Sequence, residues 1–351
     1  MALKPFPEDF VRRVIADISG SWADLGGCVR HLAFGPVEVE LRTLGRGNLE
    51  HLFPAISHGA QSAGFDAPVI VYALDSQATG MAPPPDTWPV ELDGDAHQAS
   101  SYWSADTGIG AACDLERGIW SLYDANKKTA LCWYRDGHRL PEWEPAAPFR
   151  IALHWAALSF GAQMVHGAAI GKAGRGILLT GPGGSGKSTT TAAVIEHGLE
   201  TSGEDFVLLD GGHPPKAHAL YDTLKLTGMA LDVFPRLAGA ADNPDRSGDE
   251  KARVHLSKAA TQKFVPAIAI HVLVSSRIAN AEHTTWHPSN RVKMLQALAP
   301  STMFLLRTAM RESFEHMATL VRDLPCYQLE LGRDPREVAM AMENFIETMC
   351  P

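Results

Sequence analysis

The sequence has few of the features that mark secreted or metal-stapled proteins. Its cysteines are an odd number, widely spaced and without a Cys-x-x-Cys pair: Cys28, Cys113, Cys132, Cys326 and Cys350. They indicate neither a disulfide framework nor a thiolate zinc site. The first residues contain no apolar segment of the kind that a secretory signal needs. We therefore expect a soluble protein of a reducing compartment, the cytoplasm.

The chain also lacks a long apolar run and a surplus of basic residues. The longest apolar stretch, residues 151–170, is interrupted by His154, Gln163 and His166 and is a poor bilayer span. Lys and Arg number 31 against 40 Asp and Glu, a formal net charge of -9. A general nucleic-acid binder would usually be basic. We expect no membrane and no nucleic-acid partner, and a homo-oligomer is left open.

The length of 351 residues is typical of two domains. Residues 1–150 carry 12 basic and 20 acidic residues, so the acidic surplus lies at the front. A proline-rich patch at residues 141–148 marks a boundary. We expect a smaller N-terminal α+β domain at residues 1–147, with a role in substrate recognition, and an α/β domain at residues 148–351.

Hydrophobic periodicity gives the expected elements. In the front domain we expect a helix at residues 8–18 and strands at Val37–Leu44, 69–74, 118–123 and Thr129–Tyr134. In the second domain helices and strands alternate. They are a helix at 150–164, strands at 165–170 and 176–180, a helix at Lys187–His197, strands at Phe206–Leu209 and 267–275, a helix at 300–320, a strand at 327–331 and a helix at Pro335–Met349.

The strongest motif is Gly-Pro-Gly-Gly-Ser-Gly-Lys-Ser at residues 181–188, a complete phosphate-binding loop between a strand and a helix. Its glycines let backbone N–H groups curl around an anion, and the helix N-terminus adds partial positive charge. Lys187 would reach the outer phosphates and the Ser188 hydroxyl would suit Mg²⁺. The expected nucleotide-binding residues are Gly181, Gly183, Gly184, Ser185, Gly186, Lys187, Ser188 and Thr189.

A phosphate-binding loop needs an acidic partner for Mg²⁺, and two candidates lie downstream. Asp210 directly follows the expected strand Phe206–Leu209, and the pair Glu204-Asp205 directly precedes that strand. Two adjacent acids could divide the work, one holding metal and the other taking a proton from an acceptor hydroxyl. The sequence pattern alone leaves the choice between Asp205 and Asp210 open.

Residues 166–209 resemble the HPr kinase/phosphorylase superfamily, whose fold is related to the nucleotide-binding fold of phosphoenolpyruvate carboxykinase. The resemblance rests on Val165-His166-Gly-Ala-Ala, the phosphate-binding loop and Ser202-Gly-Glu204-Asp205. It implies that Lys187 and Ser188 contact phosphate and metal, that Asp205 is a metal acid and that Glu204 is the general base. His166 matches the family's histidine near the phosphates. The resemblance favours Asp205 over Asp210.

The chain departs from the family in two respects. The family usually has Asp-Asp where this chain has Glu204-Asp205, and the arginine- and glycine-rich phosphorolysis motif is not evident. The resemblance is therefore nearer to the related kinases that phosphorylate serine hydroxyls of other molecules, some of them in ribosomal-peptide clusters such as those of lasso peptides. It implies ATP and Mg²⁺ as cofactors.

We thus expect an ATP- and Mg²⁺-dependent kinase with a peptide, protein or small-molecule hydroxyl as acceptor, most of all a serine. The alternatives are a kinase of a small molecule such as free serine and a regulatory module that hydrolyses ATP slowly. Lys225, Lys251 and Arg253 are candidate contacts to phosphate or to the acceptor. Solvated loop charges explain these three residues at least as well.

Overall fold

The computed structural model describes residues 8–45, 47–84, 100–246 and 248–350. The expected absence of a secretory signal falls mainly on residues 1–7, outside the described part. The chain forms two compact units, and it passes from unit 1 to unit 2 between Phe160 and Gly161. The sequence predicted this boundary between residues 147 and 148. Residues 54–58 also belong to unit 2 and Leu306–Met310 to unit 1. No helix among the described residues is long and apolar enough to cross a membrane.

Unit 1 is built on one eight-stranded mixed sheet in the order β3-β1-β2-β4-β8-β7-β6-β5. Its elements are α1 (Glu8–Leu25), β1 (Gly27–Phe34), β2 (Val37–Leu44), η1 (Glu50–Gly59, of which residues 54–58 lie in unit 2), β3 (Ala60–Gln61), β4 (Val69–Asp75), α2 (Ser76–Thr79), β5 (Ser100–Ser104), β6 (Ile109–Asp114), β7 (Ile119–Asp124), η2 (Ala125–Lys127), β8 (Thr129–Tyr134) and α3 (Arg150–Ser159). Along the chain, helix α1 thus precedes the strands of this sheet and helix α3 follows them.

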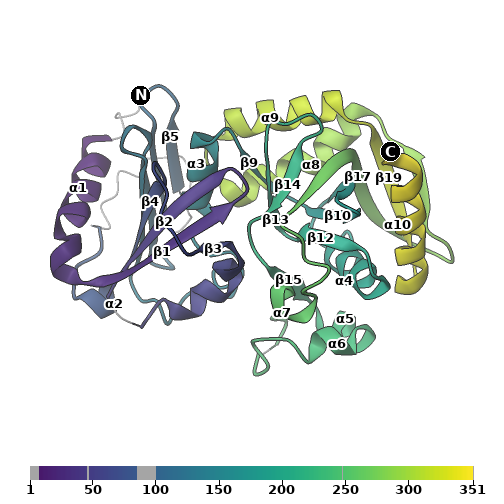
Figure 1. The fold of residues 1–351 in the computed structure, drawn as a ribbon, viewed down its shortest axis with the longest axis horizontal. Coiled ribbons are helices and arrows are strands. Elements are labelled where there is room, and N and C mark those ends of the chain that lie inside the picture. Colours follow the sequence, from purple (N-terminus) through teal and green to yellow (C-terminus); the bar gives the residue numbers. More distant parts are fainter. Residues whose placement is uncertain (1–7, 46, 85–99, 247, 351) are drawn as a thin grey trace. The chain divides into compact units, whose positions relative to one another are not determined.

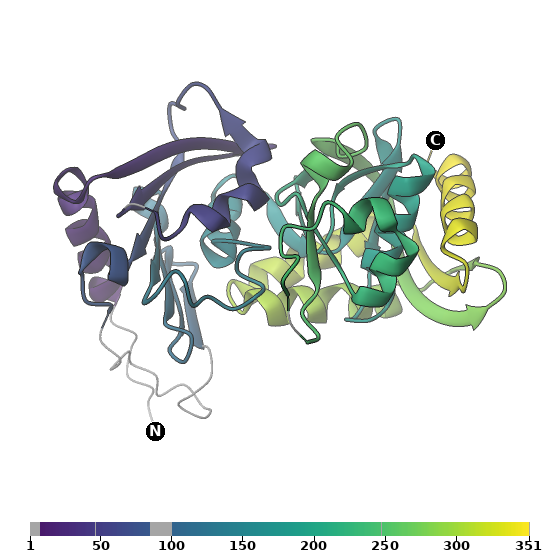
Figure 2. The same cartoon turned by 90° about the horizontal axis from the view of Figure 1, so that it is seen from below.

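Helices α1 and α3 cover opposite faces of this sheet (Figures 1 and 2). α1 buries Val11, Ile15 and Ile18, spaced for one helix face, in a core that contains Trp120 of β7. Tyr123 of β7 faces the other way, since strand side chains alternate, and its ring stacks on Trp155 of α3 with centroids 5.8 Å apart. Both faces of the sheet are therefore covered.

Unit 2 contains a nine-stranded sheet with a parallel centre, β11-β17-β19. Its elements are β9 (Gln163–His166), β10 (Ala168–Lys172), β11 (Arg175–Thr180), α4 (Lys187–His197), β12 (Glu200–Gly203), β13 (Phe206–Leu209), β14 (Lys216–Ala219), β15 (Thr223–Leu226), α5 (Gly228–Val233), α6 (Pro235–Ala238), β16 (Ala252–His255), α7 (Leu256–Ala259), β17 (Ala267–Ala281), β18 (Thr285–Pro288), α8 (Arg291–Leu306), α9 (Met310–Asp323), β19 (Cys326–Gly332) and α10 (Pro335–Met349). β15 and β16 form a separate two-stranded ribbon.

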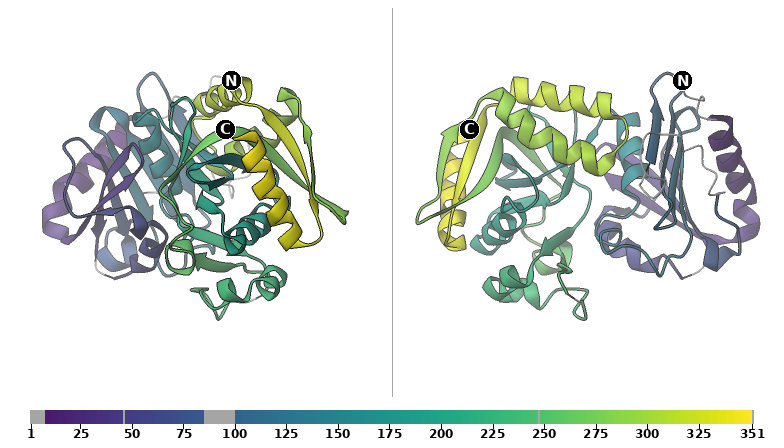
Figure 3. Two further views of the ribbon diagram at one scale, coloured as in Figure 1. Left: turned by 45° about the vertical axis from the view of Figure 1, so that its right-hand side comes forward. Right: turned by 180° about the vertical axis from the view of Figure 1, so that it is seen from behind.

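The centre of unit 2 is a three-layer α/β arrangement. Ile177 and Leu179 of β11 pack in one core with α4 and α10, and Leu178 packs in a second core with α8 and α9. α8 and α9 lie side by side on their face of the sheet (Figure 3). Strands buried on both faces are typical of parallel sheets, and they place the loop after β11 at the carboxyl edge, where such folds bind ligands.

Several expected elements of the second domain were wrong in their bounds, among them the strand expected at 267–275, which runs to Ala281 as β17. The helix expected at 150–164 ends at Ser159, because Gly161 has a φ of 68° and residues 163–166 join the sheet as β9. The strand expected at 165–170 is two strands that meet at Gly167. The helix expected at 300–320 is two helices, α8 and α9, separated at residues 307–309. Pro300 lies inside α8 instead of at a helix start.

Candidate functional site

The phosphate-binding loop connects β11, which ends at Thr180, to α4, which begins at Lys187. Gly181, Gly184 and Gly186 have φ values of 146°, 79° and 96°, a range that favours glycine. A Cβ on Gly186 would also lie 2.4 Å from Cδ1 of Leu331. The glycines are therefore required by the path of the loop, and the loop leads into the N-terminus of a helix, which attracts anions.

Lys187 is held across this loop. Its Nζ donates hydrogen bonds to the carbonyl oxygens of Gly181 at 2.8 Å and Pro182 at 3.3 Å, and the residue is 6% exposed. Burial lowers the pKa of Lys187, and the carboxylates of Glu204 and Asp205 offset part of that effect. A desolvated ammonium at the N-terminus of a helix is a strong site for a phosphate group.

The acidic pair lies at a corner where two pairs of strands meet. Glu204 and Asp205 connect β12 to β13, and His166 ends β9 opposite Phe206 of β13. The N–H of Gly167 donates to the carbonyl oxygen of Asp205 at 3.1 Å, which joins the two corners. This arrangement places His166 and both acids at one end of the strands, the end that also faces α4.

Glu204 contacts the phosphate-binding loop directly. The Ser188 hydroxyl donates to Oε1 of Glu204 at 2.6 Å, and Glu204 is 2% exposed. Its Oε2 is buried and has no hydrogen-bond partner among the described residues. Burial and the neighbouring Asp205 raise the pKa of Glu204 against the opposing effects of Ser188 and two lysines. Glu204 is therefore a buried carboxylate of raised pKa with one oxygen open to a further hydrogen bond.

Asp205 is held by two basic side chains. Its Oδ2 lies 2.7 Å from Nζ of Lys225, and its Oδ1 lies 3.2 Å from Nε2 of His166. Burial opposes the charge, but Lys225 and His166 outweigh it and keep the pKa of Asp205 far below its usual range. Asp205 has a φ of 73°, which strains most residues and which Asp and Asn adopt more readily than others. Asp205 is therefore an ionised carboxylate in a constrained position.

These oxygens suit a hard divalent cation. The Ser188 hydroxyl and the ionised Asp205 are the donor types that Mg²⁺ prefers, and Mg²⁺ commonly takes its remaining ligands from substrate phosphates and water. The residues present therefore fit a magnesium site beside the phosphate-binding loop.

Asp210 lies at the other end of β13 and has a different environment. Its Oδ1 accepts from the N–H groups of Gly212 at 3.0 Å and Lys216 at 2.8 Å, and its Oδ2 lies 2.9 Å from Nε2 of His218. Burial raises the pKa of Asp210, but these partners outweigh burial and lower it overall. These contacts are those of an aspartate that closes a turn.

Lys225 is carried by the ribbon β15–β16. Its neighbours Leu224 and Leu226 are buried in the core, so the alternation of a strand turns Lys225 to the opposite side, where Asp205 lies. Arg253 is its cross-strand partner in register, and Nε of Arg253 is 2.9 Å from Asp242. The ribbon therefore places Lys225 while Arg253 is engaged by Asp242.

A buried chain of charges fixes this ribbon. Nδ1 of His255 lies 2.8 Å from Asp222, which precedes β15, and Nε2 of His255 lies 2.8 Å from Asp242. Two carboxylate partners require both ring nitrogens to donate, as in the imidazolium form. Burial alone would lower the pKa of His255, but Asp222 and Asp242 outweigh burial and raise it to about 9.

Lys251 lies close enough to Lys187 for the charges of the two side chains to interact. It precedes β16, and its ammonium lowers the pKa of Lys187, as does that of Lys225. Of the expected phosphate or acceptor contacts, Lys225 and Lys251 thus lie within electrostatic reach of the loop lysine.

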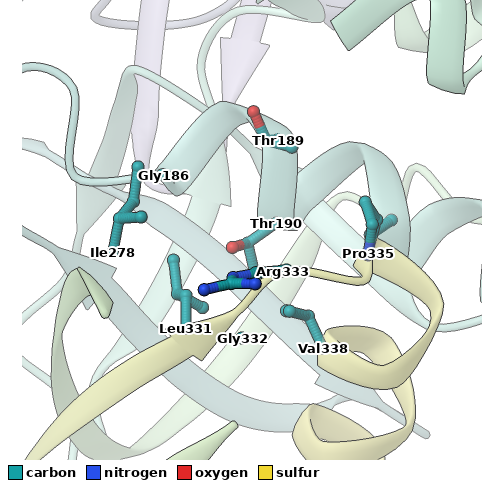
Figure 4. Close-up of a pocket in the computed structure, with 10 residues that line it drawn as sticks. Gly186, Thr189, Thr190, Ile278, Leu331, Gly332, Arg333, Pro335 and Val338 are labelled. Carbon is teal, nitrogen blue, oxygen red and sulfur yellow. The ribbon is translucent and has the colours of Figure 1, made fainter. Parts of the chain in front are cut away.

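A pocket of about 260 Å³ opens beside the loop, on the side of Thr189 and Thr190 (Figure 4). Its walls are mainly apolar, and Arg333 reaches across it in Figure 4. The lining residues are Gly186, Thr189, Thr190, Ala193, Ile278, Leu331, Gly332, Arg333, Pro335 and Val338. Pockets for drug-sized ligands are roughly 300–1,000 Å³, so this pocket is somewhat smaller than those.

The sequence did not predict this pocket or the contacts that hold the acidic pair and His166 in place. Leu331 and Arg333 come from the end of β19, far along the chain from the loop. Thr302 of α8, whose Oγ1 accepts from the N–H of His166 at 3.0 Å, was also missed. The one available signal was the Gly332-Arg333-Asp334-Pro335 segment between an expected strand and an expected helix, because ligand sites gather at such edges.

Comparison with known proteins adds a distant structural likeness. No family model and no curated protein matches the chain. Among solved structures, the HPr(Ser) kinase/phosphatase from Coxiella burnetii is similar over 53% of this chain and 95% of its own length, with 11% identity and a TM-score of 0.31. A likeness at this level establishes neither a shared family nor a shared activity.

Substitution of the two candidate metal acids, Asp205 and Asp210, should have opposite effects on the Mg²⁺ dependence of nucleotide binding. Asp205→Asn removes the charge of the proposed metal acid while keeping a residue that tolerates the positive φ, so we expect a folded protein in which Mg²⁺ strengthens nucleotide binding at least tenfold less than in wild type. Asp210→Asn should leave that dependence unchanged. Calorimetric titration of nucleotide across a series of Mg²⁺ concentrations measures both. The reverse pattern would move the metal acid to the far end of β13.

The His255 network predicts a pH-dependent stability. Its pKa is about 6.5 in an unfolded chain and about 9 in the fold, so its contribution is complete below about pH 6.5 and is lost as pH rises through 9. Thermal midpoints of wild type and His255→Gln should therefore differ most at or below about pH 6.5 and become more alike as the pH rises through about 9. Melting curves over this range provide the measurement. Curves that stay parallel would show that His255 is not charged in the fold.

Proposed function

We propose that this protein is an ATP- and Mg²⁺-dependent kinase that transfers the γ-phosphate to a hydroxyl, foremost a serine of a peptide or protein. The observation that carries the proposal is the 2.6 Å contact between Ser188 of the phosphate-binding loop and Glu204, with Oε2 of Glu204 buried and without a partner among the described residues. It joins a phosphate site to a carboxylate that can accept a proton.

The residues have separate roles in the proposed reaction. The loop amides and Lys187 bind the β- and γ-phosphates, and Ser188 and Asp205 hold Mg²⁺, which when bound neutralises charge on the phosphate oxygens. His166 keeps Asp205 oriented through its 3.2 Å contact and stands near the phosphates. Phosphoryl transfer depends mainly on positioning and charge neutralisation, which rigid side chains of this kind supply.

Glu204 serves as the general base. As the acceptor oxygen forms its bond to the γ-phosphorus, the bond from that phosphorus to the β-phosphate oxygen breaks, and ADP leaves with that electron pair. The proton of the acceptor hydroxyl passes to Oε2 of Glu204. Burial and Asp205 raise the pKa of Glu204, which makes its carboxylate a stronger base than an exposed glutamate.

The pocket beside Thr189 and Thr190 takes the nucleotide base. The phosphate chain runs along the loop toward the first turn of α4, and the pocket opens at that turn. Its apolar walls suit a flat aromatic ring, and Arg333 adds a cation that can stack on it or contact the ribose and α-phosphate.

The acceptor is proposed from the resemblance to serine kinases of peptide-modifying clusters, with unit 1 as the part that recognises it. Residues 1–150 carry 20 acidic and 12 basic residues, a charge that suits a basic peptide. A cytoplasmic location belongs to the same proposal.

Two substitutions separate nucleotide binding from transfer. Glu204→Gln keeps the shape and one hydrogen bond to Ser188 but removes the basic oxygen, so ATP·Mg²⁺ affinity should stay within about threefold while transfer falls by roughly 10²–10⁴. Lys187→Ala should weaken nucleotide binding itself by at least tenfold. Calorimetry gives the affinities, and single-turnover phosphotransfer, followed by mass spectrometry of candidate peptides, gives the rates.

Two outcomes would contradict the proposed function. If Glu204→Gln transfers phosphate at the wild-type rate, Glu204 is not the base. If ADP release by wild type is the same with and without every acceptor tested, the protein is an ATPase instead of a kinase.

Filling the pocket should weaken base binding without affecting the phosphates. Ala193 lines the pocket on α4, and Ala193→Leu places an aliphatic side chain there that helices accept readily. ATP should bind about tenfold more weakly, and inorganic tripolyphosphate should bind as to wild type. Ala341→Leu, a matched change on α10 outside the pocket, is the control. Equal weakening of both ligands would show that the pocket does not hold the base.

A further inference from the structure

The two acidic side chains of the site lie among basic ones: His166 and Lys225 contact Asp205, and Lys187 interacts with both carboxylates through its charge. Glu204 and Asp205 supply the carboxylates, and Lys187 and Lys225 supply the ammonium groups. Lys225 places its Nζ 2.7 Å from Oδ2 of Asp205, the proposed metal acid. The ammonium group of Lys225 therefore already occupies the position beside Oδ2 of Asp205.

A divalent cation that arrived alone would meet an unfavourable site. It would have to separate Lys225 from Asp205 and then lie among two partly buried ammonium groups, Lys187 and Lys225, with no new anion to balance them. Like charges at such distances repel strongly where water is scarce. The nucleotide changes this balance, because its phosphates bring the negative charge that both the cation and the lysines require.

We propose that Lys225 keeps the metal site closed until a nucleotide binds, and then moves from Asp205 to the transferred phosphate. This rests on the proposed function, since it assumes that Asp205 holds the metal. The backbone of Lys225 does not need to move, because its ribbon is fixed by His255 between Asp222 and Asp242. Rotation of a flexible lysine stem exchanges one anion for the other.

The exchange gives the site an order of binding. Metal and nucleotide enter together, and free divalent cation does not occupy Asp205 beforehand. The same lysine then contributes charge to the transferring group, as cationic clamps do in phosphoryl transfer. Lys225 is thus a residue of both the resting and the loaded site.

Binding of Mn²⁺ in the absence of nucleotide tests the proposal. Mn²⁺ replaces Mg²⁺ at oxygen sites, and its free aqueous form has a strong electron paramagnetic resonance signal that is lost on binding. Wild type should bind Mn²⁺ weakly. Lys225→Met should bind it at least tenfold more tightly, because one nearby positive charge is gone. Lys225→Gln, which keeps a hydrogen-bond donor without the charge, should behave in the same way and provides a second variant if Lys225→Met does not fold.

Two controls isolate the contact. Lys258→Met removes one charge from α7, in the same part of unit 2, and should bind Mn²⁺ as wild type does. The double variant Lys225→Met/Asp205→Asn should lose the gained affinity, because the metal acid is then neutral. If wild type and Lys225→Met bind Mn²⁺ equally, whether tightly or weakly, Lys225 does not close the site and the proposal is overturned.

A further arm separates this proposal from the proposed function. Wild type should take up Mn²⁺ when ATP is added, beyond the amount that ATP alone binds. If it does so and Lys225 makes no difference without ATP, only the closing role fails. If wild type takes up no additional Mn²⁺ with ATP, the nucleotide and metal site itself is wrong, and both proposals fall together.

Discussion

The structure of the site depends on how two adjacent buried carboxylates are kept in one corner of the fold. Glu204 and Asp205 would repel each other if both were ionised and unpaired. The fold separates their behaviour: Lys225 and His166 contact Asp205 directly, whereas the hydrogen bond that Glu204 accepts within the described part of the chain comes from the Ser188 hydroxyl. One pKa falls and the other rises, so neighbours along the chain can act as a metal acid and as a base.

This separation requires a backbone that turns sharply at two places. Gly203 and Asp205 have φ values of 140° and 73°. With these turns, Glu204 and Asp205 alone separate the end of β12 from the start of β13. Gly167 interrupts β9 and β10 opposite this turn, and its N–H bonds to Asp205. Because of the turn, Glu204 points to α4 while Asp205 points to the ribbon that carries Lys225. Strain at Asp205 is offset by the ion pair that the same conformation allows.

The parts that the sequence predicted are those with a local cause. The loop and α4 follow from a motif and its flanks, and β2, β8, β13 and α10 from hydrophobic period, with bounds that agree with the structure. The break between α8 and α9 was missed, because residues 307–309 include two non-glycine residues with positive φ that no turn residue announces. The ion pair of Lys225 with Asp205 and the pocket of Leu331 and Arg333 join segments far apart in sequence, which periodicity cannot relate.

Under the proposed function, the oxygen of Glu204 that has no partner among the described residues has a use beyond nucleotide binding. A site that only bound nucleotide would need Lys187, Ser188 and a metal acid, all of which are present without Glu204. A buried carboxylate oxygen without a partner among the described residues destabilises a fold, typically by 1–3 kcal/mol or more. Glutamine or an apolar side chain at residue 204 would lower that cost. A proton acceptor beside a phosphate site gives the unfavourable group a use, and an approaching hydroxyl would supply the hydrogen bond that Oε2 lacks.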